Sequence, residues 1–430
     1  MQQDKQALAY HLFSGRYDRA LQTEWKMGKI NDDLLDPEIV QNPSPYYKVL
    51  REEHPCYWNE RWRGWVLSRY EDVYGALHST DMLADRITPF FRHRLSAEEQ
   101  RRFALTYEVL HSFVVFLDPP RHTHLRRIFS RAFTPKAVST MRGVVEGYVQ
   151  EFFANWDGRD VVDLNKDFAY PFPANVIASI IGAPREDVHR FHGWADGLTN
   201  LLLAGVGEDQ RMDRAQDALV EFKAYLKGLY DERLKQPRDD MMSWLMEVEQ
   251  NDPTLTEDDV LHSCILLLNA GHETTQDLIC NTLTTLLELP DQMDLLRENP
   301  QHMKTGIEEG LRFNGPLKGT MRIAGKDMEI AGSRVREGDR LLLLMGAANR
   351  DPAKFENPEQ FDVTRNPNPH LSFSHGLHFC LGAPLARMEM EIAFNELLRR
   401  FPKMHLLSEV KWDPRILGRS IEAPINIALQ

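Results

Sequence analysis

Cysteine is scarce in this chain, whose 430 residues include only Cys56, Cys264, Cys280 and Cys380. A small secreted domain that depends on disulfides would be far richer in cysteine, and no two of these residues have the close spacing of a zinc-binding pair. Both classes of protein are therefore excluded. We interpret the first three cysteines as buried free thiols, whereas Cys380 lies in a segment rich in glycine and histidine.

Long apolar runs are absent as well. No segment approaches the roughly 18 apolar residues that a membrane-spanning helix requires, and the most apolar run, 265–268, lies between His262 and Asn269. The N-terminal residues are polar and lack the basic-then-apolar pattern of a signal peptide. We therefore expect a cytoplasmic protein with no membrane anchor.

Positive charge is in deficit, because 51 Lys and Arg stand against 64 Asp and Glu, which gives a net charge of −13. Clustered basic side chains bind a phosphate backbone, so this balance argues against a nucleic-acid partner. The chain also lacks internal repeats, low-complexity linkers and a clear domain boundary. We therefore expect 1–430 to form one domain, with 1–40 as an N-terminal extension.

Helical periodicity dominates the segment 119–290. Its most informative helix has Thr256 as a suitable N-cap, acidic residues in the first turn, and Pro290 at its end. A length of about 33 residues, or about 50 Å, indicates that this helix crosses the middle of the protein. Gly271 lies near its centre at a cost of about 1 kcal/mol relative to alanine. Either a neighbouring element or a ligand must therefore pack against the bare backbone.

Short strands are indicated on both sides of this helical segment. They are expected at 64–68, 321–324, 328–330 and 340–345, where apolar residues alternate or form short runs between turn residues. We expect 45–85 and 320–345 to contribute a small β region. The irregular, proline-containing stretch 350–369 follows and leads to Cys380. Loops of this length in a compact domain usually have a function.

Segment 373–382 reads Phe-Ser-His-Gly-Leu-His-Phe-Cys-Leu-Gly and fits the pattern F-x-x-G-x-H-x-C-x-G. Five fixed positions make a chance match rare, and the plain alternative is a buried cysteine before a helix. Gly376 and Gly382 allow a tight turn whose backbone approaches a large planar ligand. A helix that begins near Ala383 would direct its first N–H groups at the Cys380 sulfur and favour a thiolate. On haem iron, a thiolate donates electron density that favours O–O cleavage.

Segment 373–382 resembles the cysteine-ligand loop of the cytochromes P450, and the similarity extends in order along nearly the whole chain. The resemblance implies a single-domain cytochrome P450 fold, mainly α with a small β region. It also implies that haem b (heme b, iron protoporphyrin IX) lies between the long central helix and the Cys-ligand loop with its following helix. Cys380 would then be the ligand of the iron.

Segment 270–275 reads Ala-Gly-His-Glu-Thr-Thr and resembles the A-G-x-[DE]-T oxygen-binding motif of the same family. Thr274 lies one helical turn beyond Ala270 on the same face. A hydroxyl beside an acid can hold water and relay protons to bound dioxygen, so Glu273 and Thr274 are the expected catalytic residues. The plain alternative is a threonine that satisfies its own backbone beside a surface glutamate.

Glu309 and Arg312 match the family's E-x-x-R, for which the resemblance implies a structural role in fixing the loop before the cysteine. The spacing alone is weak evidence, because it recurs elsewhere in the chain. In the family a third member, usually an arginine, lies at the position that is Gln360 here. We expect Arg350 or Arg365 to replace it.

The two haem propionates need cationic partners. The resemblance assigns this role to four residues, of which His122 and Arg126 lie on a helix started by two prolines. Without the resemblance, His122 would be interpreted as a surface histidine. The full set of expected cofactor contacts is His122, Arg126, Ala270, Gly271, Arg322, Phe373, Gly376, His378, Cys380 and Gly382.

A local basic run accompanies His122, namely Arg121, Arg127, Arg131 and Lys136. Such a run is usually a solvated face, but the family places this helix on the cysteine side of the haem, where an electron donor docks. The resemblance therefore implies an acidic ferredoxin or flavodoxin, with its reductase, as partner. We expect no reductase domain fused to the C-terminus, and a monomer.

By resemblance, the substrate pocket lies above the haem and draws on 84–115, 191–205, the long helix, 316–320 and 416–421. The expected substrate contacts are Leu266, Asn269, Ala270, Leu317, Ile416 and Leu417. Most are apolar, which suits a largely apolar small molecule. Lys318 can meet a substrate carboxylate, although a solvent-facing lysine is the expected case.

The resemblance predicts a monooxygenase that uses electrons from the partner protein to insert one oxygen atom from O2 into an apolar substrate. One alternative is a haem-thiolate peroxygenase, whose relatives tend to lack the acid–alcohol pair. Another is a haem-binding sensor without catalysis, which would need the Cys loop but not Glu273 and Thr274. Fatty acids, terpenoids, macrolides and aromatic ethers all stay open as substrates.

Overall fold

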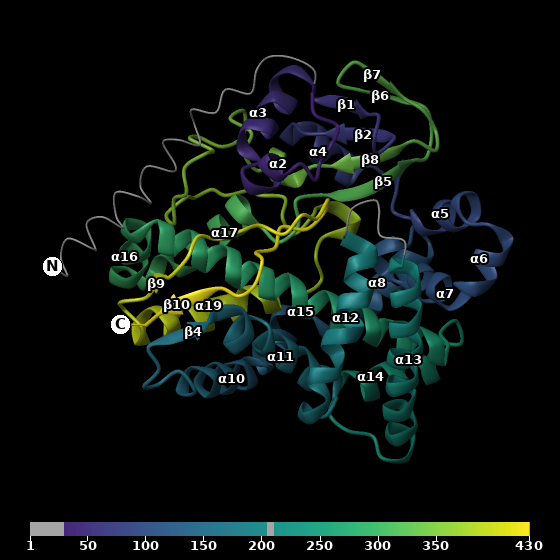
Figure 1. The fold of residues 1–430 in the computed structure, drawn as a ribbon. Coiled ribbons are helices and arrows are strands. Elements are labelled where there is room, and N and C mark those ends of the chain that lie inside the picture. Colours follow the sequence, from purple (N-terminus) through teal and green to yellow (C-terminus); the bar gives the residue numbers. More distant parts are fainter. Residues whose placement is uncertain (1–29, 204–209, 430) are drawn as a thin grey trace.

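Helices make up most of the structure, a computed structural model that describes residues 30–203 and 210–429 (Figure 1). The helices are α2 (Pro37–Gln41), α3 (Ser44–Glu53), α4 (Tyr70–His78), α5 (Ile87–Arg94), α6 (Ala97–Arg102), α7 (Ala104–Ser112), α8 (Arg121–Ala132), α9 (Pro135–Thr140), α10 (Arg142–Ala154), α11 (Pro171–Ile181), α12 (Val188–Leu203), α13 (Arg211–Lys235), α14 (Met241–Asn251), α15 (Glu257–Glu288), α16 (Pro290–Glu298), α17 (Met303–Asn314), α18 (Met345–Ala348) and α19 (Ala383–Arg400). The strands are β1 (Cys56–Asn59), β2 (Gly64–Leu67), β3 (Met82–Leu83), β4 (Val161–Asp163), β5 (Thr320–Ala324), β6 (Met328–Ile330), β7 (Ser333–Val335), β8 (Arg340–Leu343), β9 (His405–Leu406) and β10 (Asn426–Ala428). The predicted mainly α fold with a small β region is therefore confirmed. Most of the predicted N-terminal extension, 1–29, lies outside the described residues.

A five-stranded sheet with the strand order β1-β2-β8-β5-β3 lies within the two segments predicted for the β region. β2 and β8 run parallel, and the other neighbours are antiparallel. Alternate residues of β8 point to opposite faces. Leu342 packs with α2 and α3, whereas Leu341 and Leu343 pack with α4. Helices therefore cover both faces of this sheet, above the main helical layer in Figure 1.

Two smaller sheets go beyond the predicted strands. β4, β10 and β9 form an antiparallel sheet that joins 161–163 to the C-terminal residues. These strands have two or three residues each, too few for alternating apolar and polar residues to be recognised in the sequence. β6 and β7 form a hairpin closed by Ala331 and Gly332, which both have positive φ (47° and 78°), as a tight type I′ turn requires.

The long helix α15 runs through the middle of the helical part (Figure 1). Thr256 caps it as predicted, because its hydroxyl accepts the N–H of Asp259 while the Asp259 carboxylate accepts the N–H of Thr256. The helix ends at Glu288, just before Pro290. Its 32 residues agree with the expected length of about 33. In the described ranges no helix is both long enough and apolar enough to cross a membrane.

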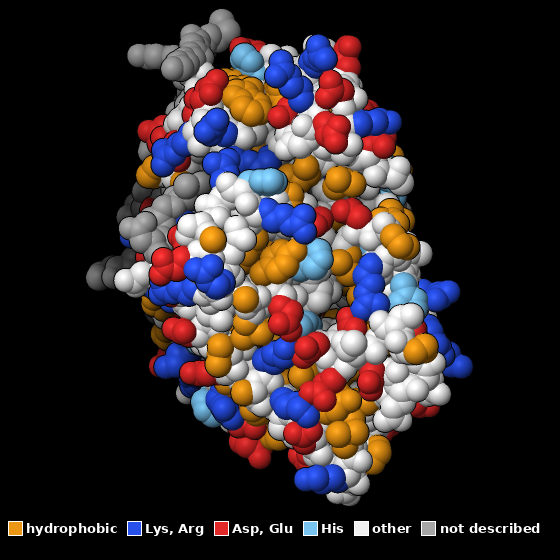
Figure 2. Space-filling model, turned by 90° about the vertical axis from the view of Figure 1, so that its right-hand side faces the viewer, with side chains coloured by type: hydrophobic (Ala, Val, Ile, Leu, Met, Phe, Trp, Pro, Cys, Tyr) orange, Lys and Arg blue, Asp and Glu red, His pale blue; other side chains and the backbone are white. Residues whose placement is uncertain are grey.

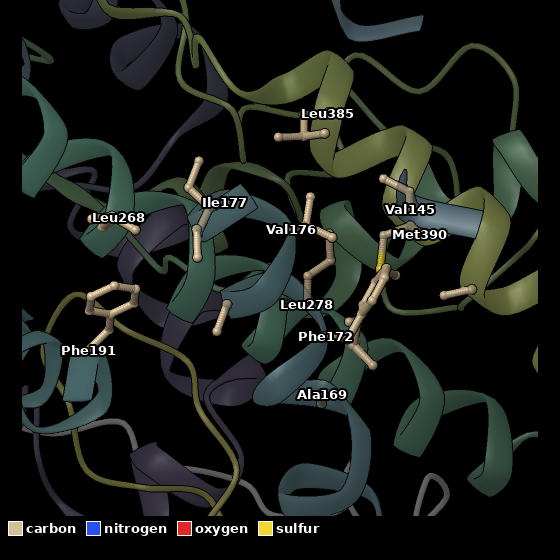
Figure 3. Close-up of a cluster of buried hydrophobic side chains, with 14 of the residues drawn as sticks. Val145, Ala169, Phe172, Val176, Ile177, Phe191, Leu268, Leu278, Leu385 and Met390 are labelled. Atoms are coloured by element: carbon tan, nitrogen blue, oxygen red, sulfur yellow. The ribbon is translucent and has the colours of Figure 1, made fainter. Parts of the chain in front are cut away.

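α11 packs against α15, and α10 and α19 complete the surrounding apolar layer (Figure 3). Val176 and Ile177 of α11 meet Leu268 and Leu278 of α15 in this layer. A Cβ added at Gly271 would lie 3.2 Å from Ile177 Cγ1. A neighbouring helix therefore packs against the bare backbone of Gly271, which is the first of the two alternatives that the sequence left open.

An ion-pair cluster links α7, α13 and α15. Lys223 Nζ of α13 lies 2.9 Å from Glu108 Oε1 of α7 and 2.8 Å from Asp258 Oδ1 of α15. The buried His262 lies beside them, with Nε2 3.5 Å from Glu108 Oε1. The ammonium supplies the positive charge that the two carboxylates require, so the cluster joins three helices at one point.

Candidate active site

The Cys380 side chain lies at the start of α19, where the first helical N–H groups converge on it. The N–H groups of Gly382 and Ala383 donate to the sulfur, and the helix begins at Ala383 as predicted. Burial raises the pKa of the Cys380 thiol, while these two N–H groups and the Arg126 guanidinium act in the opposite direction. A metal ion deprotonates a coordinating thiol outright. The sulfur therefore fits a metal ligand, whose loss of the proton a bound metal ion would favour.

A neighbouring residue explains only one of the two loop glycines. Gly376 has φ 66°, and a Cβ there would lie 2.7 Å from the carbonyl oxygen of Leu77. The close approach of α4 therefore requires this glycine. At Gly382 an added Cβ would meet no atom within 4 Å, so the protein itself does not demand glycine there. Phe373, another fixed residue of the motif, is buried. The Arg387 guanidinium lies over it, 4.6 Å from the centre of the Phe373 ring.

Basic side chains gather beside this loop. The His122 and His378 rings lie 4.3 Å apart, and both ring nitrogens of the buried His122 lack a partner among the described residues. Burial and the nearby Arg322 lower the pKa of His378 to about 3, and burial lowers the pKa of Arg322 to about 10. Arg126 donates to the Phe379 carbonyl. The cations Arg126 and Arg322, which lie beside the unpartnered ring nitrogens of His122, fit a polyanionic ligand such as two propionates.

Arg86 is a member of this group that the sequence did not indicate. Its guanidinium lies 4.5 Å from the centre of the Phe116 ring. Burial and the neighbouring Arg322 lower its pKa to about 9. Nothing in the surrounding sequence marks Arg86, because its position depends on the fold between β3 and α5.

The motif on α15 combines a bonded hydroxyl with a buried acid. Thr274 Oγ1 donates to the Ala270 carbonyl at 2.7 Å, as the plain alternative requires. Glu273 is not a surface residue, since burial raises its pKa to about 8 and its Oε2 lacks a partner among the described residues. Its carboxylate is hydrogen-bonded to Thr199 of α12. Ala270, one turn earlier, is exposed although most of the helix around it is buried.

A second buried acid, Glu389 of α19, also lay outside the predicted site. Burial raises the pKa of Glu389 well above its usual value, while a hydrogen bond with Thr275 of α15 lowers it. Its Oε2 has no partner among the described residues. No sequence motif marks Glu389, because a lone glutamate in an amphipathic helix is usually solvent-facing.

Glu309 and Arg312 form a fully buried bidentate pair, with Nε–Oε2 at 2.8 Å and Nη2–Oε1 at 2.7 Å. Arg365 is the third member of this network, because its Nε lies 3.1 and 3.2 Å from the two Glu309 oxygens. Arg350 instead pairs with Glu359 at 2.6 Å. The choice that the sequence left open is therefore settled in favour of Arg365.

The network also fixes the loop before the cysteine. Arg312 donates to the carbonyl oxygens of Asn349, Pro358 and Gln360 at 2.8–2.9 Å. Position 360 thus takes part through its backbone, which any residue supplies. This explains why glutamine is tolerated where the family usually has arginine.

Lys318 is buried, so the expected solvent-facing lysine is wrong. Its backbone is bonded on both sides, with Lys318 N–H to the Leu417 carbonyl at 2.7 Å and Gly346 N–H to the Lys318 carbonyl at 2.8 Å. The side chain is 8% exposed, and burial together with Arg419 lowers its pKa to about 7. The turn is therefore enclosed by the C-terminal segment, which the resemblance had placed beside it at the substrate pocket.

The predicted substrate contacts fall into two groups. Leu266 and Asn269 lie on α15, and Asn269 Nδ2 donates to Thr199 Oγ1 of α12 at 2.8 Å. The three residues outside the helix pack against the β region: Leu417 is buried in the cluster of α2 and α3, Ile416 lies against it, and Leu317 lies against the cluster of α4. Packing thus accounts for the second group, and its contact with substrate stays a prediction.

The predicted segment 191–205 belongs largely to α12. Phe191 is buried in a ring cluster with Trp194 and with Phe222 of α13, at centroid distances of 5.9 and 6.0 Å. It therefore joins α12 to α13 rather than lining an open pocket. Residues 204 and 205 lie outside the described ranges.

A helical fold crossed by one long helix, with a cysteine at a helix start and basic side chains gathered beside it, fits the class of haem-thiolate proteins. The profile of the family described as Cytochrome P450 matches residues 206–415. The chain is 37% identical over 390 residues to the biotin biosynthesis cytochrome P450 of Bacillus subtilis, which covers 90% of this chain and 96% of that protein. It is also 37% identical over 392 residues to cytochrome P450 CYP107DY1 of Priestia megaterium, covering 88% and 93%.

A similar fold is present in P450BioI in complex with acyl carrier protein ligated to hexadec-9Z-enoic acid, with a TM-score of 0.85 and 35% identity over 91% of this chain and 100% of that one. The chain belongs to the cytochrome P450 family. It is a monooxygenase with a haem cofactor, and the predicted fold and enzyme class are confirmed. The family also implies a small-molecule substrate and redox partners.

Proposed function

We propose that Cys380 is the thiolate ligand of haem b in this monooxygenase, with the cofactor between α15 and the Cys loop followed by α19. The observation that carries the proposal is the sulfur at the start of α19, which accepts two N–H groups. The exposed Ala270 in the middle of α15 supports it. When bound, the haem supplies the iron that uses O2 and two electrons to oxidise the substrate.

Four basic residues are proposed to bind the propionates: His122, Arg126, Arg322 and His378. The unpartnered nitrogens of His122 and the buried Arg322 beside it support this assignment. Ala270, Phe373 and Gly382 would contact the porphyrin. For Gly271 and Gly376 we propose a packing role instead, because Ile177 and the Leu77 carbonyl occupy the space beside them.

Glu273 and Thr274 are proposed to deliver protons. Glu273 holds a proton near neutral pH, because burial raises its pKa to about 8, and its Oε2 can release that proton. Thr274 donates its own hydrogen to the Ala270 carbonyl, which leaves its oxygen free to accept. A buried acid beside such an acceptor suits stepwise proton delivery, which a peroxide-driven enzyme or a haem sensor would not need.

An acidic ferredoxin or flavodoxin, reduced by its own reductase, is the proposed electron donor. Arg127 and Arg131 on α8 and Lys136 on α9 are exposed, and near them the Cys loop exposes Leu377 and Phe379 by 43% and 38%. Arg121 does not belong to this surface, since it pairs with Asp259. On the face shown in Figure 2, acidic and basic side chains are interspersed and no single sign predominates. We expect docking to depend on these local basic residues, because a chain with a net charge of −13 offers no broad positive field.

A largely apolar small molecule is the proposed substrate. Leu266 and Asn269 lie on α15 next to the exposed Ala270, so they are the first candidates for contact. A long acyl chain, such as the one present in the P450BioI complex, has the chemistry such a wall would accept. A spectral screen for displacement of iron-bound water, with fatty acids, acyl carrier protein conjugates, steroids and macrolides, would identify the class.

Cys380→Ser and Thr274→Ala together test this proposal. The reduced protein with carbon monoxide should show haem-thiolate ligation, and Cys380→Ser should abolish that spectrum. Thr274→Ala should keep the spectrum but consume O2 and electrons with little product. An unchanged spectrum in Cys380→Ser would remove the ligand assignment, and unchanged coupling in Thr274→Ala would remove the proton-delivery assignment.

A further inference from the structure

A second carboxyl group, that of Asp277, lies one turn beyond Glu273 on α15. Asn269, Glu273 and Asp277 follow at intervals of four residues and therefore form one stripe on the helix. Asp277 is 9% exposed, and the Ser420 hydroxyl donates to its Oδ2 at 2.6 Å. Side chains of α12 and of the C-terminal segment 412–421 cover this stripe. Asp277 is buried, whereas Glu273 is half-buried and has a buried Oε2 with no partner among the described residues.

One cation serves both acids. The Arg415 guanidinium is near enough to Glu273 and to Asp277 to favour their charged forms, and both carboxyls in turn raise the pKa of Arg415. Arg415 is also ion-paired with Asp413, with Nε 2.8 Å from Oδ2. The charge of Asp277 disfavours ionisation of Glu273. Ionising both Glu273 and Asp277 would cost free energy, because one guanidinium would have to compensate three carboxylates in a largely buried site.

The stripe therefore retains at least one proton near neutral pH. Burial raises the pKa of Glu273 to about 8 and that of Asp277 to about 7. The hydrogen bond from Ser420 favours the charged form of Asp277. The other titratable groups that face the pair are Asp196 on α12, Tyr170 before α11, Cys280 on α15 itself, and Asp413 and Arg415 in the C-terminal segment.

We propose that Asp277 is a positioning residue that acts through Glu273: by its own negative charge and by sharing Arg415, it determines how readily Glu273 releases its proton. This rests on the proposed proton-delivery role of Glu273. Asp277 itself touches no reacting atom. When Asp277 is ionised, its negative charge attracts Arg415 and disfavours ionisation of Glu273. Glu273 therefore keeps its proton and can donate it.

Two substitutions should shift Glu273 in opposite directions. Asp277→Asn removes the repelling charge and leaves Arg415 to be shared by Glu273 and Asp413 only, so Glu273 should ionise about one pH unit lower. Arg415→Gln removes the attraction, so Glu273 should ionise at higher pH. Asp277→Glu keeps the charge and should behave like the parent protein. Asp217→Asn, at an exposed acid on α13, is the matched control and should change nothing.

The primary measurement uses the resting haem-loaded protein without turnover. Infrared spectra between pH 5 and 10 would follow the protonated-carboxyl band that Glu273→Gln eliminates. The midpoint of this band should fall in Asp277→Asn and rise in Arg415→Gln. The ratio of product formed to O2 consumed should fall at alkaline pH. In each variant the pH of this fall should shift in the same direction as the midpoint of the band. A purely structural role of Asp277 predicts no such pair of opposite shifts.

The outcomes separate this inference from the proposed function. An unshifted Glu273 band in Asp277→Asn, or shifts of the same sign in both variants, overturns the role of Asp277 even if Glu273 proves essential. A different result would be opposite shifts in Asp277→Asn and Arg415→Gln together with an unaltered ratio of product to O2 in Glu273→Gln. That result would keep the electrostatic link between Asp277 and Glu273 but remove the proposed proton-delivery role of Glu273.

Discussion

Replacing Arg365 by alanine should lower the free energy of unfolding by about 2–4 kcal/mol, because a hydrogen bond to a buried charged group contributes about 1.5–3 kcal/mol. Its Nε lies 3.1 and 3.2 Å from the two carboxylate oxygens of Glu309, and Nη1 donates to the Glu356 carbonyl at 2.7 Å. Glu309 would keep its bidentate contact with Arg312. The loss should therefore not exceed the roughly 3–5 kcal/mol of a buried charge left without any partner.

A double-mutant cycle would measure the contact itself. Urea unfolding of the haem-loaded protein, followed by circular dichroism, would compare Arg365→Ala, Glu309→Gln and the double variant. We expect a coupling of about 1.5 kcal/mol or more between these positions. The same cycle with Arg350→Ala should show none, because Arg350 pairs with Glu359. Coupling of Glu309 to Arg350 and not to Arg365 would refute the assignment.

Two other predictions concern Lys318 and the basic surface. Burial lowers the pKa of Lys318 to about 7 in the folded protein, whereas its usual pKa in an unfolded chain is 10.5. Between these two pH values the unfolded chain binds more protons than the folded protein. The free energy of unfolding should therefore rise with pH in this range, by up to about 1.4 kcal/mol per pH unit. Lys318→Met should remove that rise, and an equal slope in both proteins would show that the lysine is not buried. Arg131→Glu should raise the KM for an acidic ferredoxin and weaken its dependence on salt, while carbon monoxide binding stays unchanged; a KM equal to that of the parent protein would exclude docking at α8.

The parts of the fold that the sequence predicts are those specified by neighbouring residues. Thr256, the acidic first turn and Pro290 fix both ends of α15 within one residue of the expectation. The parallel pairing of β2 with β8 has no such signal, because Trp65 and its partner Leu341 lie far apart in the chain. The sheet of β4, β10 and β9 is similarly determined by distant partners.

The same distinction divides the candidate site. Cys380 and its helix are predictable because the fixed residues and the start of α19 are contiguous. Arg86 and Lys318 are not, since their burial depends on segments far away in the chain. The C-terminal segment shows this most clearly: it brings Arg415 and Ser420 to the acids of α15 and Leu417 to the β region. Its irregular backbone leaves no periodicity from which these contacts could be inferred.

Burial, not spacing, gives the E-x-x-R pattern its meaning. The pair Glu396–Arg399 has the same spacing and a similar contact of 2.7 Å, but Arg399 is 70% exposed, whereas Glu309 and Arg312 are not exposed at all. The difference arises from how closely the helix approaches its neighbour. A Cβ at Gly310, between Glu309 and Arg312, would lie 2.5 Å from Thr282 Oγ1, so only glycine lets α17 come this near to α15. The glycine inside the motif thus allows α15 to enclose the ion pair. The enclosed Arg312 donates to three backbone carbonyls, and Arg365 binds Glu309. Together these contacts order the loop that leads to the cysteine.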